Sequence, residues 1–198
     1  QGLADGYFVL PYTIQNYLAD QITVPRFSTE LPEFAEAEKA VQARIDHLMG
    51  IKGKKSVDSI HKELGHIMWE YVGMGRTEEG LKTALKLLKD IRKEFETNLF
   101  IPGSTEGVNI ELEKALRLND FITMGELIAY DALNRNESCG GHFREEYQTE
   151  EGEAKRDDEN YFYVSCWEYQ GSDDVAPVLY KEPLVYEAIK VQTRNYKS

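Results

Sequence analysis

The residue types most often used for chemistry are densest between positions 135 and 144. This stretch holds two arginines, a glutamate, a serine, a cysteine and a histidine around the pair Gly140-Gly141. One interpretation is a structured turn that follows a helix. The other is a loop that docks another domain or forms part of an active site. Charged groups in loops serve both purposes, so the residue types alone leave both interpretations open.

Two glycine-bearing segments are candidates for a phosphate-binding loop. Residues 50–56 combine glycines, lysines and a serine, but the glycine spacing differs from that of a P-loop and a helix precedes it instead of a strand. Gly73 and Gly75 precede a predicted helix, yet no third glycine stands at the spacing of a dinucleotide-binding turn. We interpret the first segment as a solvated basic turn and the second as a helix end. The sequence therefore predicts no cofactor-binding residue.

A metal site has equally little support. Cys139 and His142 have the spacing of half a tetrahedral site, and Cys166 is the other cysteine, but a fourth ligand is missing. His61 and His66 lie on different faces of a predicted helix because they are five residues apart. We expect no metal ligand here. Cys166 alternates with apolar residues and is interpreted as a small core residue.

Catalysis by a nucleophile or an acid–base pair is also not indicated. Carboxylates are abundant, but no serine stands in a glycine elbow and none pairs clearly with a histidine. The paired glutamates at 145–146 and 150–151 are typical of a solvated surface. We predict no catalytic residue in this chain.

The elements that must position these residues are mostly helical. Apolar side chains recur at helical spacing over residues 6–20, 31–49, 56–71, 77–95 and 110–133. Pro11 marks a point where the first helix kinks or begins. Ser56 and Thr77 are placed to cap two of the later helices, and Gly73 ends one of them.

After residue 133 the periodicity changes. We expect a polar loop over residues 136–158, strands over 161–169 and 178–180 joined by a turn at 171–174, and an extended segment over 184–191. Both faces of the first strand carry residues suited to burial, and Pro183 limits pairing of the last segment. Helices followed by strands predict a mainly α fold. This is an antiparallel bundle of three or more helices with a small antiparallel β appendage.

Composition and charge exclude several functions. The chain has 198 residues with 23 Lys and Arg against 35 Asp and Glu, a net charge of −12. Such a surface repels phosphate backbones and anionic lipid, so we expect no nucleic-acid binding. No stretch reaches the roughly 20 apolar residues that span a bilayer, so we expect no direct membrane insertion. Two cysteines are too few for a disulfide framework, which favours a reducing cytoplasm.

Four short segments are distinctive in combination, namely residues 68–81, 133–147, 156–161 and 179–181. The first resembles the Met-Trp-Asp-His-Val-Gly-x-x-Arg-Thr helix junction of the flavoprotein subunits of succinate dehydrogenase and fumarate reductase. The second resembles their Arg-x-Glu-Ser-Arg-Gly-x-His-x-Arg-x-Asp-Tyr run. The last two are similar to their Arg-Asp-Asp-Glu-Asn-Trp and Tyr-Lys/Arg-Pro segments. Cys139 stands where the family usually has arginine, and Gly141 where alanine is common.

The resemblance implies a subunit that interconverts fumarate and succinate through FAD and exchanges electrons with an iron–sulfur subunit. In that family the flavin and the dicarboxylate are held by groups in the flavin-binding and capping domains. The chain opens on Gln1 with apolar sequence directly after it, so we expect it to be cut from a longer protein downstream of those groups. FAD is then expected in the full-length subunit and not in this chain. The expected location is cytoplasmic, at the inner face of the membrane through partner subunits.

These considerations divide the chain into three parts. We expect residues 1–24 to be the terminal helix of a missing flavin-binding domain, residues 25–134 the bundle, and residues 135–198 a docking loop with a β-rich tail. Residues 6–18 are too apolar for a water-facing helix, so we expect them to pack on the flavin domain of the parent protein. Without that domain we expect them to fold into the groove of the bundle or to drive self-association. The residues expected to dock domains, rather than to catalyse, are Arg135, Glu137, His142, Arg144 and Arg156.

Two alternatives remain open. The chain is a free-standing helical interaction module, or it is the C-terminal domain of an L-aspartate oxidase, since those enzymes share the Glu-Ser-Arg-Gly-x-His run. If the full reading frame carries a glycine-rich dinucleotide motif upstream of Gln1, the chain is part of a flavoprotein. If a start codon lies near Gln1, the chain is a free-standing module.

Overall fold

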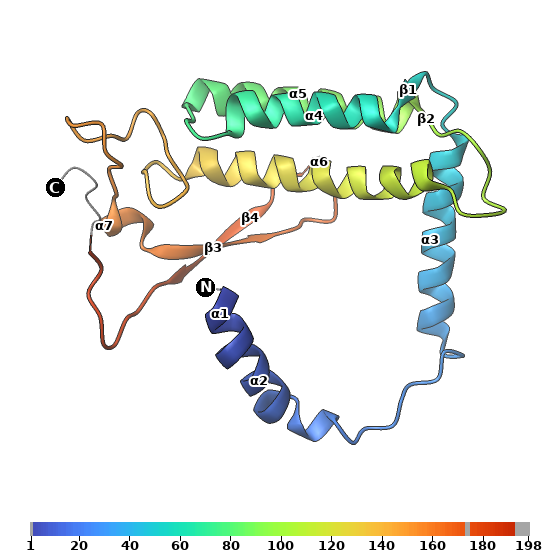
Figure 1. Cartoon of the computed structure of the whole chain (residues 1–198), viewed down its shortest axis with the longest axis horizontal. Coiled ribbons are helices and arrows are strands. Elements are labelled where there is room, and N and C mark those ends of the chain that lie inside the picture. The colour runs from blue at the N-terminus through green and yellow to red at the C-terminus, as the bar shows by residue number, and fades with distance from the viewer. Residues whose placement is uncertain (1, 173–174, 193–198) are drawn as a thin grey trace. The chain divides into compact units, whose positions relative to one another are not determined.

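The computed structural model describes residues 2–172 and 175–192 (Figure 1). The chain divides into two compact units, Gln1–Arg44 and Ile45–Ser198. The boundary falls inside helix α3 (Pro32–Gly50), so the last turns of that helix belong to the second unit. Among the described residues, no helix combines the length and the apolar character needed to cross a membrane.

The first unit begins with consecutive helical turns, as the apolar spacing predicts. They are α1 (Gly2–Ala4), the π-helical η1 (Asp5–Val9), α2 (Leu10–Tyr12), the π-helical η2 (Thr13–Tyr17) and the 3₁₀ turn η3 (Ala19–Gln21). Pro11 lies in the short α2 between the two π segments and has no N–H to donate. The turn before it closes from the Leu10 N–H to the Asp5 carbonyl, five residues back. No side chain of these five segments is buried.

The second unit contains the other elements. After the end of α3 they are β1 (Lys55–Ser56), α4 (Val57–Val72), α5 (Glu78–Asn98), β2 (Leu99–Phe100), α6 (Ile110–Asn134), α7 (Asp158–Tyr161), β3 (Tyr163–Glu168) and β4 (Val178–Pro183). Helices α4, α5 and α6 lie side by side and alternate in direction (Figure 1). The hairpin of β3 and β4 follows them. The predicted fold class, a mainly α antiparallel bundle with a small antiparallel β appendage, is confirmed.

Local signals explain where the three bundle helices begin. The Ser56 hydroxyl accepts from the Ser59 N–H, the Thr77 hydroxyl from the Gly80 N–H, and the Asn109 side chain from the Leu112 N–H. Each bond satisfies an amide that has no partner inside its helix. Helix α4 ends at Gly73 as predicted.

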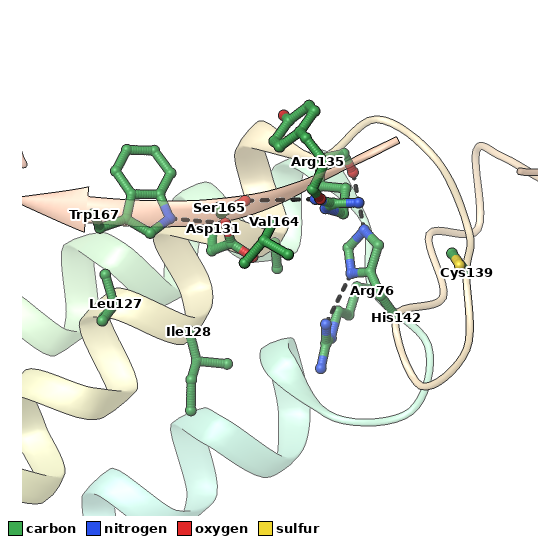
Figure 2. A pocket seen from close by; sticks show the side chains of 12 residues that line it. Arg76, Leu127, Ile128, Asp131, Arg135, Cys139, His142, Val164, Ser165 and Trp167 are labelled. Atoms are coloured by element: carbon green, nitrogen blue, oxygen red, sulfur yellow. Dashed lines mark hydrogen bonds between the residues drawn. The ribbon is translucent and has the colours of Figure 1, made fainter. Parts of the chain in front are cut away.

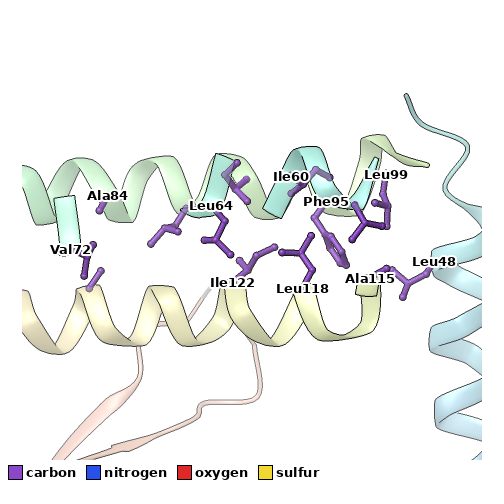
Figure 3. Close-up of a cluster of buried hydrophobic side chains, with 14 of the residues drawn as sticks. Leu48, Ile60, Leu64, Val72, Ala84, Phe95, Leu99, Ala115, Leu118 and Ile122 are labelled. Carbon is purple, nitrogen blue, oxygen red and sulfur yellow. The ribbon is translucent and has the colours of Figure 1, made fainter. Parts of the chain in front are cut away.

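The core lies between α4, α5 and α6, with Leu48 from the end of α3 (Figure 3). Its buried apolar side chains include Ile60, Leu64, Leu81, Leu88, Phe95, Leu118 and Ile122. Small residues on α6 allow the helices to approach closely. A Cβ added at Gly125 would lie 3.1 Å from the Met68 sulfur, so even an alanine there would crowd α4. Of the predicted α3 stripe, Leu48 is buried in this core and Ile45 packs against it, whereas Phe34 and Val41 in the first unit are exposed.

The β structure differs from the sequence prediction in several places. Strands β1 and β2 form a two-residue parallel pair that the pattern did not indicate. Strand β3 pairs with β4 in antiparallel register, but only one of its faces is partly covered. Val164 and Cys166 are exposed on the other face, so the interpretation of Cys166 as a core residue is wrong. Residues 184–191 contain no strand. The predicted turn includes positions 173–174, which lie outside the described residues.

Candidate functional site

The loop that follows α6 carries all five predicted docking residues, and the structure brings four of them, Arg135, Glu137, His142 and Arg144, into one hydrogen-bonded network. It crosses from the C-terminal end of α6, touches the turn between α4 and α5, and returns to α7 and β3 (Figure 1). Short hydrogen-bonded turns, and not helix or strand, hold its backbone. Its arrangement therefore depends on side chains.

Arg144 is completely buried at the C-terminal end of α6. Its Nη1 donates to the Ala132 carbonyl at 3.1 Å and to the Leu133 carbonyl at 3.4 Å. These carbonyls are among the last four of the helix, which have no partner inside it, and they carry the negative end of its dipole. The guanidinium thus caps the helix with both hydrogen bonds and charge. Its Nε binds Glu146 at 3.0 Å, which balances the buried charge.

The backbone at Arg144 ties the loop to the turn before α5. The Arg76 N–H donates to the Phe143 carbonyl at 3.1 Å, and the Glu145 N–H donates to the Arg76 carbonyl at 2.9 Å. Inside the loop, the buried Ser138 hydroxyl exchanges hydrogen bonds with both backbone groups of Arg144. The loop is therefore attached both to the end of α6 and to the turn before α5, where Arg76 and His142 meet across 66 residues of sequence.

Glu146 completes this junction from the exposed side. Its carboxylate accepts from the Glu78 N–H in the first turn of α5 as well as from Arg144. Burial alone raises the pKa of the Glu146 carboxyl, but the hydrogen bonds from the Glu78 backbone and from Arg144 outweigh it, and the net pKa is lowered. Glu146 is therefore held ionised.

Arg135 joins the loop to the β appendage. Its Nη1 donates to Glu137 at 2.8 Å and to the Tyr161 carbonyl at 3.1 Å, while its Nη2 donates to the Tyr163 carbonyl at 3.0 Å. The guanidinium also lies 4.9 Å from the centre of the Tyr163 ring. Glu137 is 2% exposed, and its second oxygen accepts from the Asp157 N–H. The partly buried Arg135 and the buried Glu137 thereby fix both ends of the loop.

His142 lies between two arginines. Its Nδ1 is 2.9 Å from Arg76 Nη1, and its Nε2 is 2.9 Å from the Arg135 carbonyl. Because a guanidinium only donates, Nδ1 accepts and Nε2 carries the proton. Burial, followed by the positive charges of Arg76, Arg144 and Arg135, lowers the pKa of His142, with the carbonyl bond acting in the opposite direction. The imidazole is therefore neutral, and both nitrogens are in use.

Within the described part of the chain, Arg156 forms no hydrogen bond to the other four, although the charge of Glu137 lies near enough to act on its pKa. It binds Asp158 through Nε at 2.9 Å and donates through Nη1 to the Gln192 carbonyl at 3.3 Å. The hydrogen bond to Asp158 raises the pKa of Arg156. Arg156 thus connects the end of the loop to the C-terminal tail.

A cavity of about 510 Å³ opens between the loop, α6 and β3 (Figure 2). Its lining includes Arg76, Asp131, His142 and Trp167. The Trp167 indole donates to Asp131 at 2.8 Å and packs edge-on against Tyr130. Sequence reasoning missed Arg76, Asp131 and Trp167 as members of this site. The signal for Arg76 was its place in the segment at 68–81, whereas nothing local distinguished Asp131.

The described side chains do not form a metal centre. No group of three or more His, Cys, Asp or Glu residues gathers within the described part of the chain. Cys139 and His142 face each other through backbone hydrogen bonds of 2.8 and 3.0 Å, which make a tight turn. Since both nitrogens of His142 have hydrogen-bond partners, no lone pair is left for a metal.

The helix N-termini do not fit a flavin pyrophosphate. The first turns of α4, α5 and α6 contain Asp58, Glu78 and Glu111 respectively, and each N-terminus is capped by its own side chain. A dinucleotide site needs free amides and a glycine-rich approach at that place. Binding of FAD by these residues is therefore disfavoured by charge and by hydrogen bonding, and its absence from this chain stays a prediction.

Comparison with known proteins identifies the family. A sequence model described as fumarate reductase flavoprotein C-term matches residues 61–196. This covers more than half of the chain, which therefore belongs to that family, the C-terminal part of the succinate dehydrogenase and fumarate reductase flavoproteins. The fumarate reductase flavoprotein subunit of Proteus vulgaris is 29% identical over 148 residues, 73% of this chain and 24% of that protein. The chloroplastic L-aspartate oxidase 2-b of Nicotiana tabacum is 37% identical over 88 residues, 44% of this chain and 13% of that protein.

The fold also recurs in solved structures. A quinol-fumarate reductase with menaquinol molecules superposes with a TM-score of 0.69 at 22% identity, over 85% of this chain and 28% of that one. At this identity the likeness concerns the fold. The chain spans about a fifth of the length of the curated relatives it matches. The resemblance to the family is thus confirmed, and the relatives are FAD-dependent oxidoreductases of which this chain matches one part.

Proposed function

We propose that the chain is the helical C-terminal domain of a flavoprotein subunit that interconverts fumarate and succinate through FAD. The whole subunit would exchange electrons with an iron–sulfur subunit and lie on the cytoplasmic side of the membrane through partner subunits. Within it, this domain supplies scaffold and contacts, and no group of the reaction. The flavin would be held by the flavin-binding and capping domains of the same polypeptide.

One observation carries the structural role. Two arginines of the loop, Arg135 and Arg144, bind backbone carbonyls and carboxylates of the chain itself. Arg144 Nη2 has no hydrogen-bond partner among the described residues, but it is buried and faces no solvent. His142 is held as a neutral hydrogen-bonding group. Catalytic groups need a free donor or acceptor aimed at substrate. A loop held by such a network has a fixed shape, which is what a docking surface between domains requires. We infer that the five predicted residues shape the docking element.

The L-aspartate oxidase alternative has a specific observation in its favour. The tobacco enzyme has the higher identity of the two reported relatives, although over a shorter stretch. The fumarate reductase match covers more of the chain, 73% against 44%, and the family model at residues 61–196 includes the β appendage. The length of the match therefore favours the fumarate or succinate enzymes. The free-standing module is disfavoured because the relatives are about five times longer than the matched region.

The test uses the complete protein expressed from its full reading frame. Bound flavin is measured by absorbance after gel filtration, and activity by dye-linked fumarate reduction, succinate oxidation and L-aspartate oxidation in parallel. We expect stoichiometric FAD and turnover of the dicarboxylates. Turnover of L-aspartate alone would select the oxidase, and a complete protein without flavin would support the module.

A further inference from the structure

The β3–β4 hairpin has one edge directed at the cavity. In the described residues these two strands pair only with each other. The Phe162 carbonyl accepts from the Leu184 N–H on the β4 side, whereas the Tyr161 and Tyr163 carbonyls accept from Arg135 on the opposite side. Backbone groups alternate in direction along a strand. The backbone N–H and C=O groups of Ser165 and Trp167 therefore point to the same side as those of Tyr163, away from β4.

Arg135 binds the Tyr163 carbonyl at the start of this edge, but it does not bind the backbone of Ser165 or Trp167. Its Nη2 reaches the Tyr163 carbonyl at 3.0 Å and only the side chain of Ser165, at 3.5 Å. From Ser165 to Trp167 the strand borders the cavity of about 510 Å³ (Figure 2). A strand edge left open in this way offers N–H and C=O groups at the spacing of another strand.

Arg76, from the turn before α5, and Asp131, from α6, offer the cavity a donor and an acceptor. Arg76 uses Nε for the Val72 and Gly73 carbonyls and Nη1 for His142. Its Nη2 has no partner among the described residues, and no direct ion pair there joins it to Asp131. Asp131 Oδ1 accepts from Trp167. Arg76 and Asp131 nevertheless lie close enough that the carboxylate opposes the burial that lowers the pKa of Arg76.

This combination matches the chemistry of a peptide. A carbonyl oxygen or a carboxamide side chain accepts from a guanidinium, and its N–H donates to a carboxylate. A small anion would bind Arg76 but would be repelled by Asp131. A cation would bind Asp131 but would be repelled by Arg76. Addition of a strand gives affinity through the backbone, while side chains enter flanking pockets.

We propose that an extended peptide segment adds to the free edge of β3, bonding to the backbone of Ser165 and Trp167 and placing a polar group between Arg76 and Asp131. The occupant is a segment of the flavin-binding part of the same polypeptide, a statement that rests on the proposed function. The matched relatives extend far beyond the region aligned with this chain, which leaves ample sequence to supply it.

The first experiment measures hydrogen–deuterium exchange at single amides, in the 198-residue chain alone and in the complete flavoprotein. We expect the Ser165 and Trp167 amides to exchange at least about tenfold more slowly in the complete protein. The Lys181 amide is the control, because it lies opposite Ser165 and faces the other edge of the hairpin. Equal exchange at Ser165 and Trp167 in the two samples would overturn the proposal.

Matched proline variants of the complete protein test the same edge. Ser165→Pro removes an N–H that faces the cavity, and Lys181→Pro removes one that faces away. Protection at Trp167 should be lost in the first variant and kept in the second. The proposed occupant would be wrong if the 198-residue chain alone became protected as its concentration rises. It would also be wrong if protection of the complete protein required an added iron–sulfur subunit. Flavin content is measured separately. A complete protein that binds flavin but shows no protection at Ser165 and Trp167 refutes this inference. A complete protein that shows this protection but binds no flavin refutes the proposed function.

Discussion

Residues 2–44 and the bundle of the second unit are both helical, but their helices are stabilised differently. In the bundle, side chains such as Ile60, Leu88 and Ile122 have no exposed surface. Between residues 2 and 44 no residue is buried, although the segment is rich in aromatic and aliphatic side chains. Tyr7 is 73% exposed and Tyr17 82%. Periodicity alone therefore does not distinguish a helix that makes its own core from one whose apolar side needs another surface.

The comparison has an energetic meaning. Burying one large apolar side chain is worth about 1.5–3 kcal/mol, and short helices without tertiary packing are marginal in water. The bundle obtains this contribution within residues 45–198. The first unit obtains little of it, so its order in solution depends on a surface that covers its apolar residues.

The largest expected effect is a core truncation in the bundle. Leu88→Ala should lower the free energy of unfolding by about 2–5 kcal/mol, because the cavity it leaves lies among α4, α5 and α6. The matched change Leu10→Ala in the first unit should cost less than about 0.5 kcal/mol. Urea denaturation followed by circular dichroism measures both. Equal losses in the two variants would remove the distinction between the units.

Arg144 extends the comparison to a buried charge. Arg144→Ala leaves the last carbonyls of α6 and the buried Ser138 junction without their partner, and should cost about 2–4 kcal/mol. In the complete protein we also expect reduced flavin retention. Arg117→Ala is the control, since its pair with Glu113 on α6 is exposed and such pairs contribute about 0–1 kcal/mol. Normal flavin content and melting with loss of turnover alone would contradict the docking role.

A smaller effect should appear as a pH dependence. The folded pKa of His142 is depressed from its ordinary 6.5 by burial and by Arg76, Arg144 and Arg135. The unfolded chain therefore binds a proton more readily, and stability present above pH 6.5 is lost as the pH falls towards the folded pKa. The slope is at most about 1.4 kcal/mol per pH unit for one proton. Neutral His142 bonds to Arg76 and to the Arg135 carbonyl, roles that glutamine can also fill.

The measurement is the urea midpoint between pH 7.5 and pH 5.5, compared with that of His142→Gln. The wild-type protein should lose more stability than the variant over this interval. Identical slopes would show that His142 is not held neutral. Since carboxylates titrate in both proteins, the difference between them, and not the absolute slope, isolates the histidine.

The parts of the structure that follow local rules were predictable from sequence. Ser56 and Thr77 cap helices because an N-cap interaction involves only three or four neighbouring residues. The exposure of Val164 and Cys166 was not predictable, because alternation gives two faces without saying which one another element covers. The pair Lys55–Leu99 joins strands of two residues, too short to leave a pattern.

The candidate site likewise contains residues that could be predicted from the sequence and residues that could not. Arg135, Glu137, His142 and Arg144 stood out because rare residue types cluster in ten positions. Arg76 lies in a distinctive segment, but its contact with His142 joins positions 66 residues apart and leaves no local pattern. Asp131 did not stand out, since its partner Trp167 lies on another element and spacing within α6 does not reveal it. The direction of each side chain also decided its role: Arg144 could have faced a partner, but its burial shows that it caps α6.

The smallest expected effect on folding belongs to the apolar face of the first unit. The double substitution Tyr17→Ser with Leu10→Ser should leave the urea midpoint of the bundle unchanged within about 0.5 kcal/mol, since neither side chain is buried. It should nevertheless weaken self-association of the 198-residue chain, because an uncovered apolar patch of this size promotes contact between copies. Static light scattering over a concentration series measures this, with a chain lacking residues 1–20 as the reference. A wild-type chain that stays monomeric at every concentration would show that residues 6–18 fold back on the chain itself. A double variant with a lowered urea midpoint would show that this contact is made with the bundle.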